Sequence, residues 1–94
     1  MANILIAYAT RQGQTGKIAR HMAETLRAHG DSAALLDTDA PGPGVTVNRF
    51  DAVVVVAPIH AGGYPKSIVR FAKANAQALE RTMSAFCSVG LAVA

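Results

Sequence analysis

The chain has a single cysteine, no tryptophan and no long run of apolar residues. Cys87 alone cannot close an intramolecular disulfide or form a cysteine cage around a metal ion, so neither can stabilise the fold. The longest apolar run, residues 52–58, has the length of a strand. It falls far short of the roughly 18–20 residues that a membrane-spanning helix needs. The first residues lack the basic start and cleavage site of a signal peptide, so we expect a cytoplasmic location.

Charged residues are also scarce, at 16% of the 94 residues, whereas hydrophobic residues make up 51%. This balance excludes a disordered chain, which needs low hydrophobicity and high charge. Nine basic residues against six acidic ones give a net charge of +3 at pH 7. The basic residues are scattered, without runs or interleaved aromatics, and we expect no nucleic-acid partner. Anionic small molecules, or an anionic membrane surface as a peripheral contact, stay open as partners.

Short apolar runs alternate with segments of helical periodicity, which predicts a single α/β domain over residues 1–94. The strands are predicted at residues 3–9, 32–37, 51–57 and 84–89. The helices are predicted at residues 15–29, ending before Gly30, and at residues 67–79. Their inward faces are predicted to carry Ile18, Ala19, Met22, Ala23 and Leu26, and then Ile68, Phe71, Ala72, Ala76 and Leu79. This order of elements favours a parallel sheet with right-handed crossovers.

The remaining segments, residues 10–16, 38–48 and 58–66, are predicted to be loops, because they gather glycine, proline and polar residues. The four consecutive valines at residues 53–56 lack any polar alternation. This run therefore predicts a central strand that is covered on both faces.

The loop at residues 10–16 has the composition of a phosphate-binding turn. Ligands of an open parallel sheet bind beyond the carboxyl ends of its strands, and this loop follows the first strand. Gly13 allows tight curvature, Thr10 and Thr15 offer hydroxyls, and Arg11 adds a positive charge. The backbone N–H groups at the start of the next helix add further donors. The same residues fit equally well a plain turn that Thr15 caps.

Three better-known kinds of nucleotide or phosphoryl site do not match the positions of the residues in this chain. Residues 10–18 lack the glycine and Ser/Thr positions of a P-loop and carry only two of the three glycines of a dinucleotide-binding turn. A phosphoryl-accepting receiver domain needs an aspartate at the carboxyl end of the third strand. Asp51 stands at the opposite end of that predicted strand.

The loop and its flanks resemble the phosphate loop of the flavodoxin family. The positions that keep the spacing of that pattern are Tyr8, Thr10, Gly13, Thr15 and Ala19, whereas Ala7 and Met22 depart mildly from it. Residues 57–64 resemble the flavin-contacting loop after the third strand of that family. Within the family, the likeness is greatest to the menaquinone-dependent protoporphyrinogen oxidases.

The resemblance implies a flavodoxin-like open parallel sheet of strand order 2-1-3-4 and an FMN-binding oxidoreductase, of the quinone-dependent protoporphyrinogen oxidase type. The implied cofactor-binding residues are Thr10, Arg11, Gln12, Gly13, Gln14 and Thr15 at the phosphate, Pro58, Ile59, His60, Ala61, Gly62 and Tyr64 along the flavin ring, and Ser88. Tyr64 either stacks on the ring or anchors the loop, and His60 either donates a hydrogen bond or is a plain exposed histidine. Catalytic residues stay unassigned, because the sequence shows no acid–base pair that acts alone.

The chain departs from this pattern where a fifth strand and a final helix are expected, and where residues 41–44 replace a helix between the second and third strands. We therefore expect poor cover on one face of the valine strand and an open edge on the fourth strand. Such a chain associates into a homo-oligomer or is a fragment of a longer one.

Two alternatives to the enzyme stay open. One is an FMN electron-transfer module that serves a partner protein, and the other is a flavin-free domain that acts in assembly. The basic charge fits an enzyme for a carboxylate-bearing porphyrinogen, with a quinone or another small molecule as redox partner, better than it fits a carrier. Lys66, Arg70 and Lys73 share helical spacing and predict a solvated face, with a membrane or acidic-partner patch as the alternative.

Overall fold

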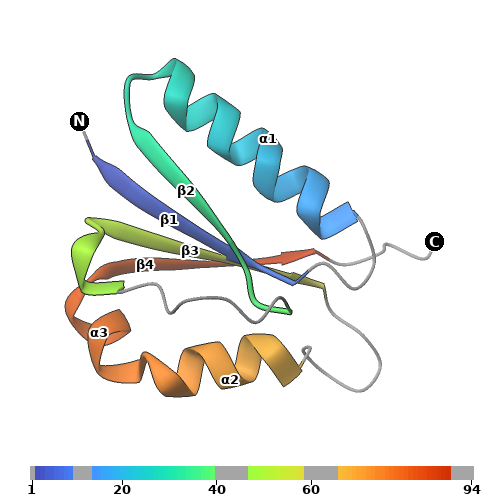
Figure 1. Cartoon of the computed structure of the whole chain (residues 1–94), viewed down its shortest axis with the longest axis vertical. Coiled ribbons are helices and arrows are strands. Elements are labelled where there is room, and N and C mark those ends of the chain that lie inside the picture. Colours follow the sequence, from blue (N-terminus) through green and yellow to red (C-terminus); the bar gives the residue numbers. More distant parts are fainter. Residues whose placement is uncertain (1, 10–13, 40–46, 59–65, 90–94) are drawn as a thin grey trace.

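The computed structural model of the chain describes residues 2–9, 14–39, 47–58 and 66–89. Four parallel strands form one sheet in the order β2-β1-β3-β4 (Figure 1). The strands are β1 (Asn3–Tyr8), β2 (Ser32–Asp37), β3 (Ala52–Pro58) and β4 (Met83–Val89). The helical elements are α1 (Gln14–Ala28), the 3-10 turn η1 (Val47–Arg49), α2 (Lys66–Ala74) and α3 (Ala76–Arg81). The predicted parallel sheet and its strand order are confirmed.

The helices cover opposite faces of the sheet, with α1 on one face and α2 and α3 on the other (Figure 1). The chain runs from β1 outward to β2 and from β3 outward to β4. Right-handed crossovers in these two directions place the connecting helices on different faces. Side chains alternate accordingly, because successive residues of a strand point to opposite faces. Ile6 and Val56 pack toward α1, whereas Leu5 and Val53 pack toward α2 and α3.

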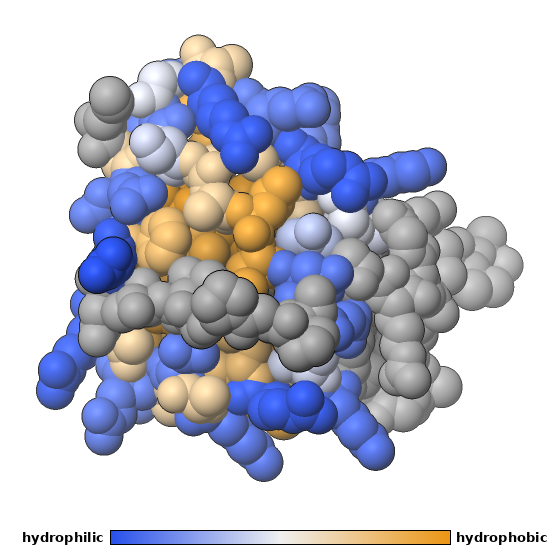
Figure 2. Space-filling view, viewed as in Figure 1, coloured by the Kyte–Doolittle hydropathy of each residue, from blue (hydrophilic) through white to orange (hydrophobic). Residues whose placement is uncertain are grey.

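The valine strand is covered on both faces, as the lack of polar alternation predicted. Val53 and Val56 are fully buried and Val55 is 6% exposed, whereas Val54 is half-buried. The expectation of poor cover is therefore wrong for three of the four valines. The reason is that α1 covers the face that carries Val56, whereas η1 and α3 add cover beside α2 on the other face. Val47 of η1 lies in the same buried cluster as Val53 and Val55. Figure 2 shows the hydrophobic side chains gathered between the two helical layers, with hydrophilic side chains around the rim.

The first predicted helix is confirmed within one residue at each end, and its predicted inward face packs on the sheet. The second is wrong as one continuous helix, because Asn75 interrupts it. The backbone N–H of Asn75 and its side-chain Nδ2 both donate to the Phe71 carbonyl oxygen, at 3.1 and 2.9 Å. An asparagine side chain can compete for backbone partners in this way and end a helix. The break turns Ala76, which was expected to face inward, out to solvent.

The predicted loops are shorter in the structure. Val47–Arg49 is a 3-10 turn, Gln14–Gly16 and Lys66 are helical, and Pro58 pairs with Val89 as the last residue of β3. Residues 41–44, predicted to be a proline- and glycine-rich loop, lie outside the described residues. Asp51 accepts a hydrogen bond from the Asn3 N–H at the amino edge of the sheet, so it is at the wrong end for a receiver-type aspartate, as expected.

Candidate functional site

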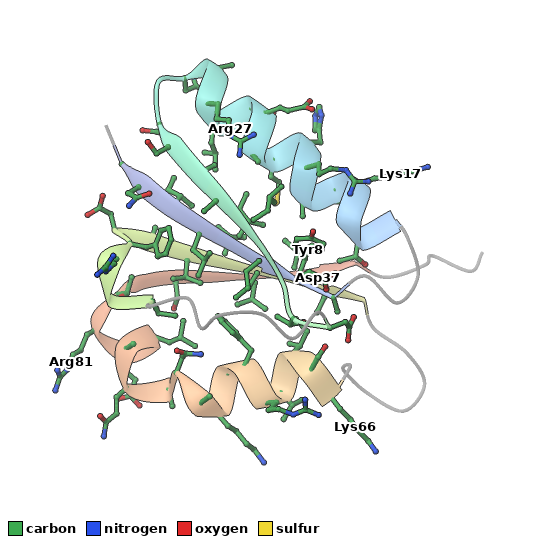
Figure 3. The ribbon with its side chains drawn as sticks, viewed as in Figure 1. Tyr8, Lys17, Arg27, Asp37, Lys66 and Arg81 are labelled. Atoms are coloured by element: carbon green, nitrogen blue, oxygen red, sulfur yellow. The ribbon has the colours of Figure 1, made fainter. Side chains whose placement is uncertain are left out.

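The carboxyl ends of the four strands gather at one edge of the sheet, because all the strands are parallel. The two central strands, β1 and β3, are also where the chain changes direction across the sheet. The helices that follow these two strands lie on opposite faces of the sheet, and open α/β sheets bind ligands beyond the strand ends at such a switch point. Tyr8 closes β1 at this edge and pairs in register with Asp37 at the end of β2 (Figure 3).

The amino end of α1 supplies donors to this edge. The helix begins at Gln14, and its first turn carries no acidic residue. Thr15 in that turn is 1% exposed. Among the residues whose burial the structure describes, it is the one polar residue that is buried. The free N–H groups and the positive end of the helix dipole favour an anion here. Lys17, two positions after Thr15, is exposed and adds a full positive charge (Figure 3).

The amino end of α2 lies at the same edge, below the sheet in Figure 3. It also lacks acidic residues in its first turn, and Lys66 is exposed there. Ser67 is half-buried, and its hydroxyl lies 2.9 Å from the Thr38 hydroxyl, which follows β2. The Thr38 hydroxyl also donates to the Tyr8 carbonyl oxygen at 3.1 Å. These contacts join the ends of β1 and β2 to the start of α2.

Carboxylates occupy the outer end of this edge. The backbone N–H of Asp39 donates to Asp37 Oδ1 at 2.9 Å, which forms a tight turn after β2. Because β2 is an outer strand, this negative charge lies to one side of the switch point between β1 and β3. An anion is therefore better placed at the first turn of α1 than beyond β2.

The structure brings four of the sequence-predicted site residues to the carboxyl side of the sheet. Gln14 and Thr15 lie in the first turn of α1, Pro58 ends β3, and Ser88 pairs with Ala57 across to β4. The others lie outside the described residues and stay predictions: Thr10, Arg11, Gln12, Gly13, Ile59, His60, Ala61, Gly62 and Tyr64. Sequence reasoning missed Thr38 and Ser67. A hydroxyl residue directly after a predicted strand was the available signal for Thr38.

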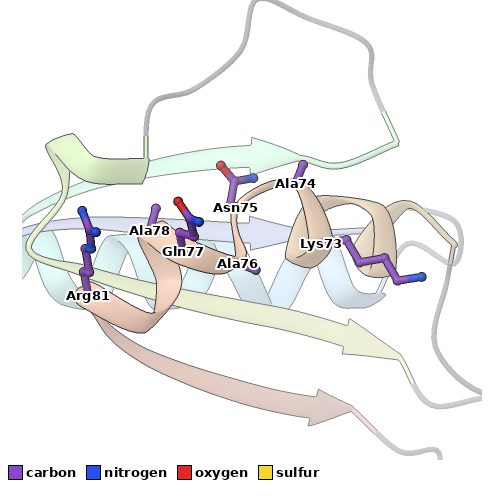
Figure 4. Close-up of a pocket in the computed structure, with 7 residues that line it drawn as sticks. All are labelled: Lys73, Ala74, Asn75, Ala76, Gln77, Ala78 and Arg81. Atoms are coloured by element: carbon purple, nitrogen blue, oxygen red, sulfur yellow. The ribbon is translucent and has the colours of Figure 1, made fainter.

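A hollow of about 550 Å³ lies at the junction of α2 and α3, at the far end of α2 from Lys66 (Figure 4). Its lining residues are Lys73, Ala74, Asn75, Ala76, Gln77, Ala78 and Arg81. The side chains of Lys73 and Arg81 extend in opposite directions in Figure 4, so they do not converge on one ligand. Over the described ranges, no group of three or more His, Cys, Asp or Glu residues is arranged to hold a metal ion. None of the helices described is long and apolar enough to cross a bilayer.

Comparison with sequences identifies bacterial relatives. The chain is 36% identical over 87 residues to protoporphyrinogen IX dehydrogenase (quinone) of Escherichia coli strain K12. The match covers 93% of this chain and 48% of that protein. The protein of the same name from Escherichia coli O157:H7 matches with the same identity and cover. The chain thus spans about half the length of these curated relatives.

Comparison with solved structures identifies flavodoxins, each aligned over 96% of this chain. A short-chain flavodoxin associated with a bacterial microcompartment gives a TM-score of 0.76 at 19% identity, over 62% of its own chain. Fusobacterium nucleatum flavodoxin bound to flavin mononucleotide gives 0.69 at 21% identity, over 53% of its chain. Oxidised flavodoxin 1 from Bacillus cereus gives 0.68 at 15% identity, over 85% of its chain. These structural similarities show that the chain has the same fold as the flavodoxins.

A family model described as "Flavodoxin domain" matches residues 5–94, which is nearly the whole chain. The strand order, the helix on each face and the resemblance at residues 6–19 agree with this match. The chain therefore belongs to the flavodoxin domain family.

Proposed function

We propose that the chain is an FMN-binding, flavodoxin-like oxidoreductase domain. The observation that carries this proposal is the first turn of α1, which meets the switch point of the sheet with a buried threonine and no acidic residue. Two further findings support it: the family match, and the Fusobacterium nucleatum flavodoxin of the same fold that is bound to FMN.

The donors at this turn suit a phosphate monoester. A helix N-terminus offers backbone N–H groups and partial positive charge, which are what a dianion requires. In the proposed complex, the backbone N–H groups of residues 11–15 and the hydroxyls of Thr10 and Thr15 hold the phosphate. Lys17 supplies long-range attraction from its exposed position.

The flavin ring is assigned to the segment that follows β3, as the resemblance to the flavodoxin family implies. Pro58 is the last residue of β3, and the residue before it, Ala57, pairs with Ser88 of β4. We assign Pro58, residues 59–62, Tyr64 and Ser88 to the ring side of the site. A bound flavin supplies hydride and electron chemistry, and these protein residues orient it and set its surroundings.

The reaction we propose is the oxidation of a porphyrinogen with a quinone or another small molecule as electron acceptor. The support is the 36% identity to the Escherichia coli protoporphyrinogen IX dehydrogenase (quinone), of which the chain spans about half. The net charge of +3 favours a substrate that carries carboxylates. Lys66, Arg70 and Lys73 are all exposed on α2 and offer a peripheral contact to an anionic membrane, where quinones reside.

Titration of the purified chain with FMN tests the proposal directly. We expect the flavin fluorescence to be quenched on binding, and we expect Thr15→Val to weaken the affinity about 10- to 100-fold. This range follows from losing one hydrogen bond to a charged group, worth about 1.5–3 kcal/mol. Thr15→Ser keeps the hydroxyl and is expected to restore most of the affinity.

Thr25→Val is the matched control on the same helix, because Thr25 is exposed and its hydroxyl donates only to the His21 carbonyl oxygen at 2.9 Å. Equal affinity of wild type and Thr15→Val would contradict the assigned phosphate site. Wild type without any quenching would support the flavin-free alternative. If FMN binds, consumption of a porphyrinogen with a quinone acceptor separates an enzyme from an electron-transfer module that serves a partner protein.

A further inference from the structure

The Thr38 side chain lies at the meeting point of three elements. It directly follows β2, its hydroxyl donates to the carbonyl oxygen of Tyr8 at the end of β1, and it lies 2.9 Å from the Ser67 hydroxyl in the first turn of α2. The backbone N–H of Thr38 donates to the same Tyr8 oxygen at 2.8 Å. All three residues are half-buried, so water competes only partly for these bonds.

The direction of each hydrogen bond follows from the number of hydrogens. A threonine hydroxyl has one hydrogen, and a carbonyl oxygen can only accept. The Thr38 hydrogen is therefore used on the Tyr8 oxygen, and the Ser67 hydroxyl must donate to Thr38. The result is a directed chain from Ser67 through Thr38 to Tyr8, which we call the Thr38 bridge. A chain of this kind is cooperative, because each hydroxyl that donates becomes a better acceptor.

The Thr38 bridge joins the end of β1 to the first turn of α2. Tyr8 ends the strand that leads toward α1, whose first turn carries Thr15. Ser67 lies in the first turn of α2, on the other face of the sheet. Ile68 in the first turn of α2 packs in the core with Leu5 and Val53, but this apolar contact is not directional. The Ser67–Thr38 contact adds a directional link between that turn and the strand ends.

We propose that Thr38 is a positioning residue that couples the end of β1 to the start of α2, and so holds the two sides of the flavin site at a fixed separation. This inference rests on the proposed function. Flavin must contact both sides at once, so a site whose sides drift apart loses affinity even when the domain stays folded.

The test measures FMN affinity by fluorescence quenching for a set of variants of the full chain. We expect Ser67→Ala, which loses only the contact with Thr38, to weaken FMN binding about 5-fold, as the loss of one net hydrogen bond implies. Thr38→Val keeps the shape but loses the hydroxyl contacts to both Ser67 and Tyr8, so we expect it to weaken binding by at least that factor. In the double variant we expect the same loss as in Thr38→Val alone, because Ser67→Ala breaks a contact that Thr38→Val has already removed. Thr38→Ser is expected to restore wild-type affinity.

Each variant is compared with Thr25→Val, which loses a threonine-to-carbonyl bond that joins no two elements. Far-UV circular dichroism and thermal unfolding check that every variant is folded at the temperature of the titration. Additive losses, or unchanged FMN affinity in a destabilised but folded Thr38→Val, would overturn the positioning role. If wild type itself fails to bind FMN, the proposed function fails, and the role of Thr38 in flavin binding fails with it.

Discussion

At the residue scale, Gly30 adopts the left-handed backbone that the end of α1 requires. Its N–H donates to the Arg27 carbonyl oxygen at 3.0 Å, and the N–H of Asp31 donates to the Leu26 carbonyl oxygen at 3.0 Å. This pair of bonds is the Schellman motif that ends helices, and it requires a left-handed residue at the glycine position. The φ angle of Gly30 is indeed +91°.

We expect Gly30→Ala to lower the free energy of unfolding by about 1–2 kcal/mol, which is the cost of left-handed backbone for a residue with a Cβ atom. Space is not the cause, because a Cβ at this position would meet no atom within 4 Å. Gly30→Asn should lose less, since asparagine tolerates this region better. Urea denaturation followed by circular dichroism measures both values. Equal stability of wild type and Gly30→Ala would show that the motif does not hold in solution.

At the element scale, the short turn η1 contributes a buried residue to the hydrophobic core. It lies within a segment that the sequence predicts to be a loop, yet Val47 is 2% exposed in the cluster that covers one face of β3. The backbone N–H of Phe50 donates to the Val47 carbonyl oxygen at 3.0 Å, which closes the turn just before β3. Together with α3, which also contacts η1, it covers the valine strand where α2 ends.

We therefore expect Val47→Ala to destabilise the fold by about 2 kcal/mol, from the lost burial of two methyl groups and the cavity that remains. Val69→Ala is the matched control, because Val69 is 40% exposed on α2. It should change the stability by no more than about 0.5 kcal/mol. Thermal and urea unfolding measure both variants. Similar small losses for the two would mean that η1 is not part of the core.

At the scale of the whole molecule, the two outer strands differ in how they are protected. Arg27 of α1 donates to the Ala33 carbonyl oxygen of β2 at 2.8 Å, which places a charged side chain on that strand. Charged residues on an outer strand discourage pairing with another chain. At the other side of the sheet, β4 pairs with β3 and has no second partner among the described strands.

We expect the isolated chain to self-associate in a concentration-dependent way, because an unpaired strand edge presents a row of backbone donors and acceptors. Light scattering should give a mass near twice 9.7 kDa at high concentration and a lower mass on dilution. Intact-mass spectrometry controls for the length of the chain itself. A mass of 9.7 kDa that does not change with concentration would contradict this prediction.

The strands, the face of α1 that packs on the sheet, the end of α1 at Gly30 and the parallel topology could all be predicted from the sequence. The physical reason is that hydrophobic periodicity and glycine act locally, so neighbouring residues alone reveal them. The family resemblance at the first loop was readable for the same reason, since its residues lie in one short segment. The predicted site residues at 10–13, 59–62 and 64 lie outside the described residues and stay predictions.

Other features depend on contacts between distant parts of the chain, and only the tertiary structure decided them. The Thr38–Ser67 contact joins residues separated by 29 positions, and the burial of Val47 depends on β3 and its neighbours. The break at Asn75 is local, since this residue bonds to the Phe71 carbonyl oxygen four positions earlier, but the hydrophobic spacing of residues 67–79 did not reveal it. Local patterns thus determined which segments form strands and helices, whereas the packing of those elements determined where the buried turn and the bridged edge of the site are.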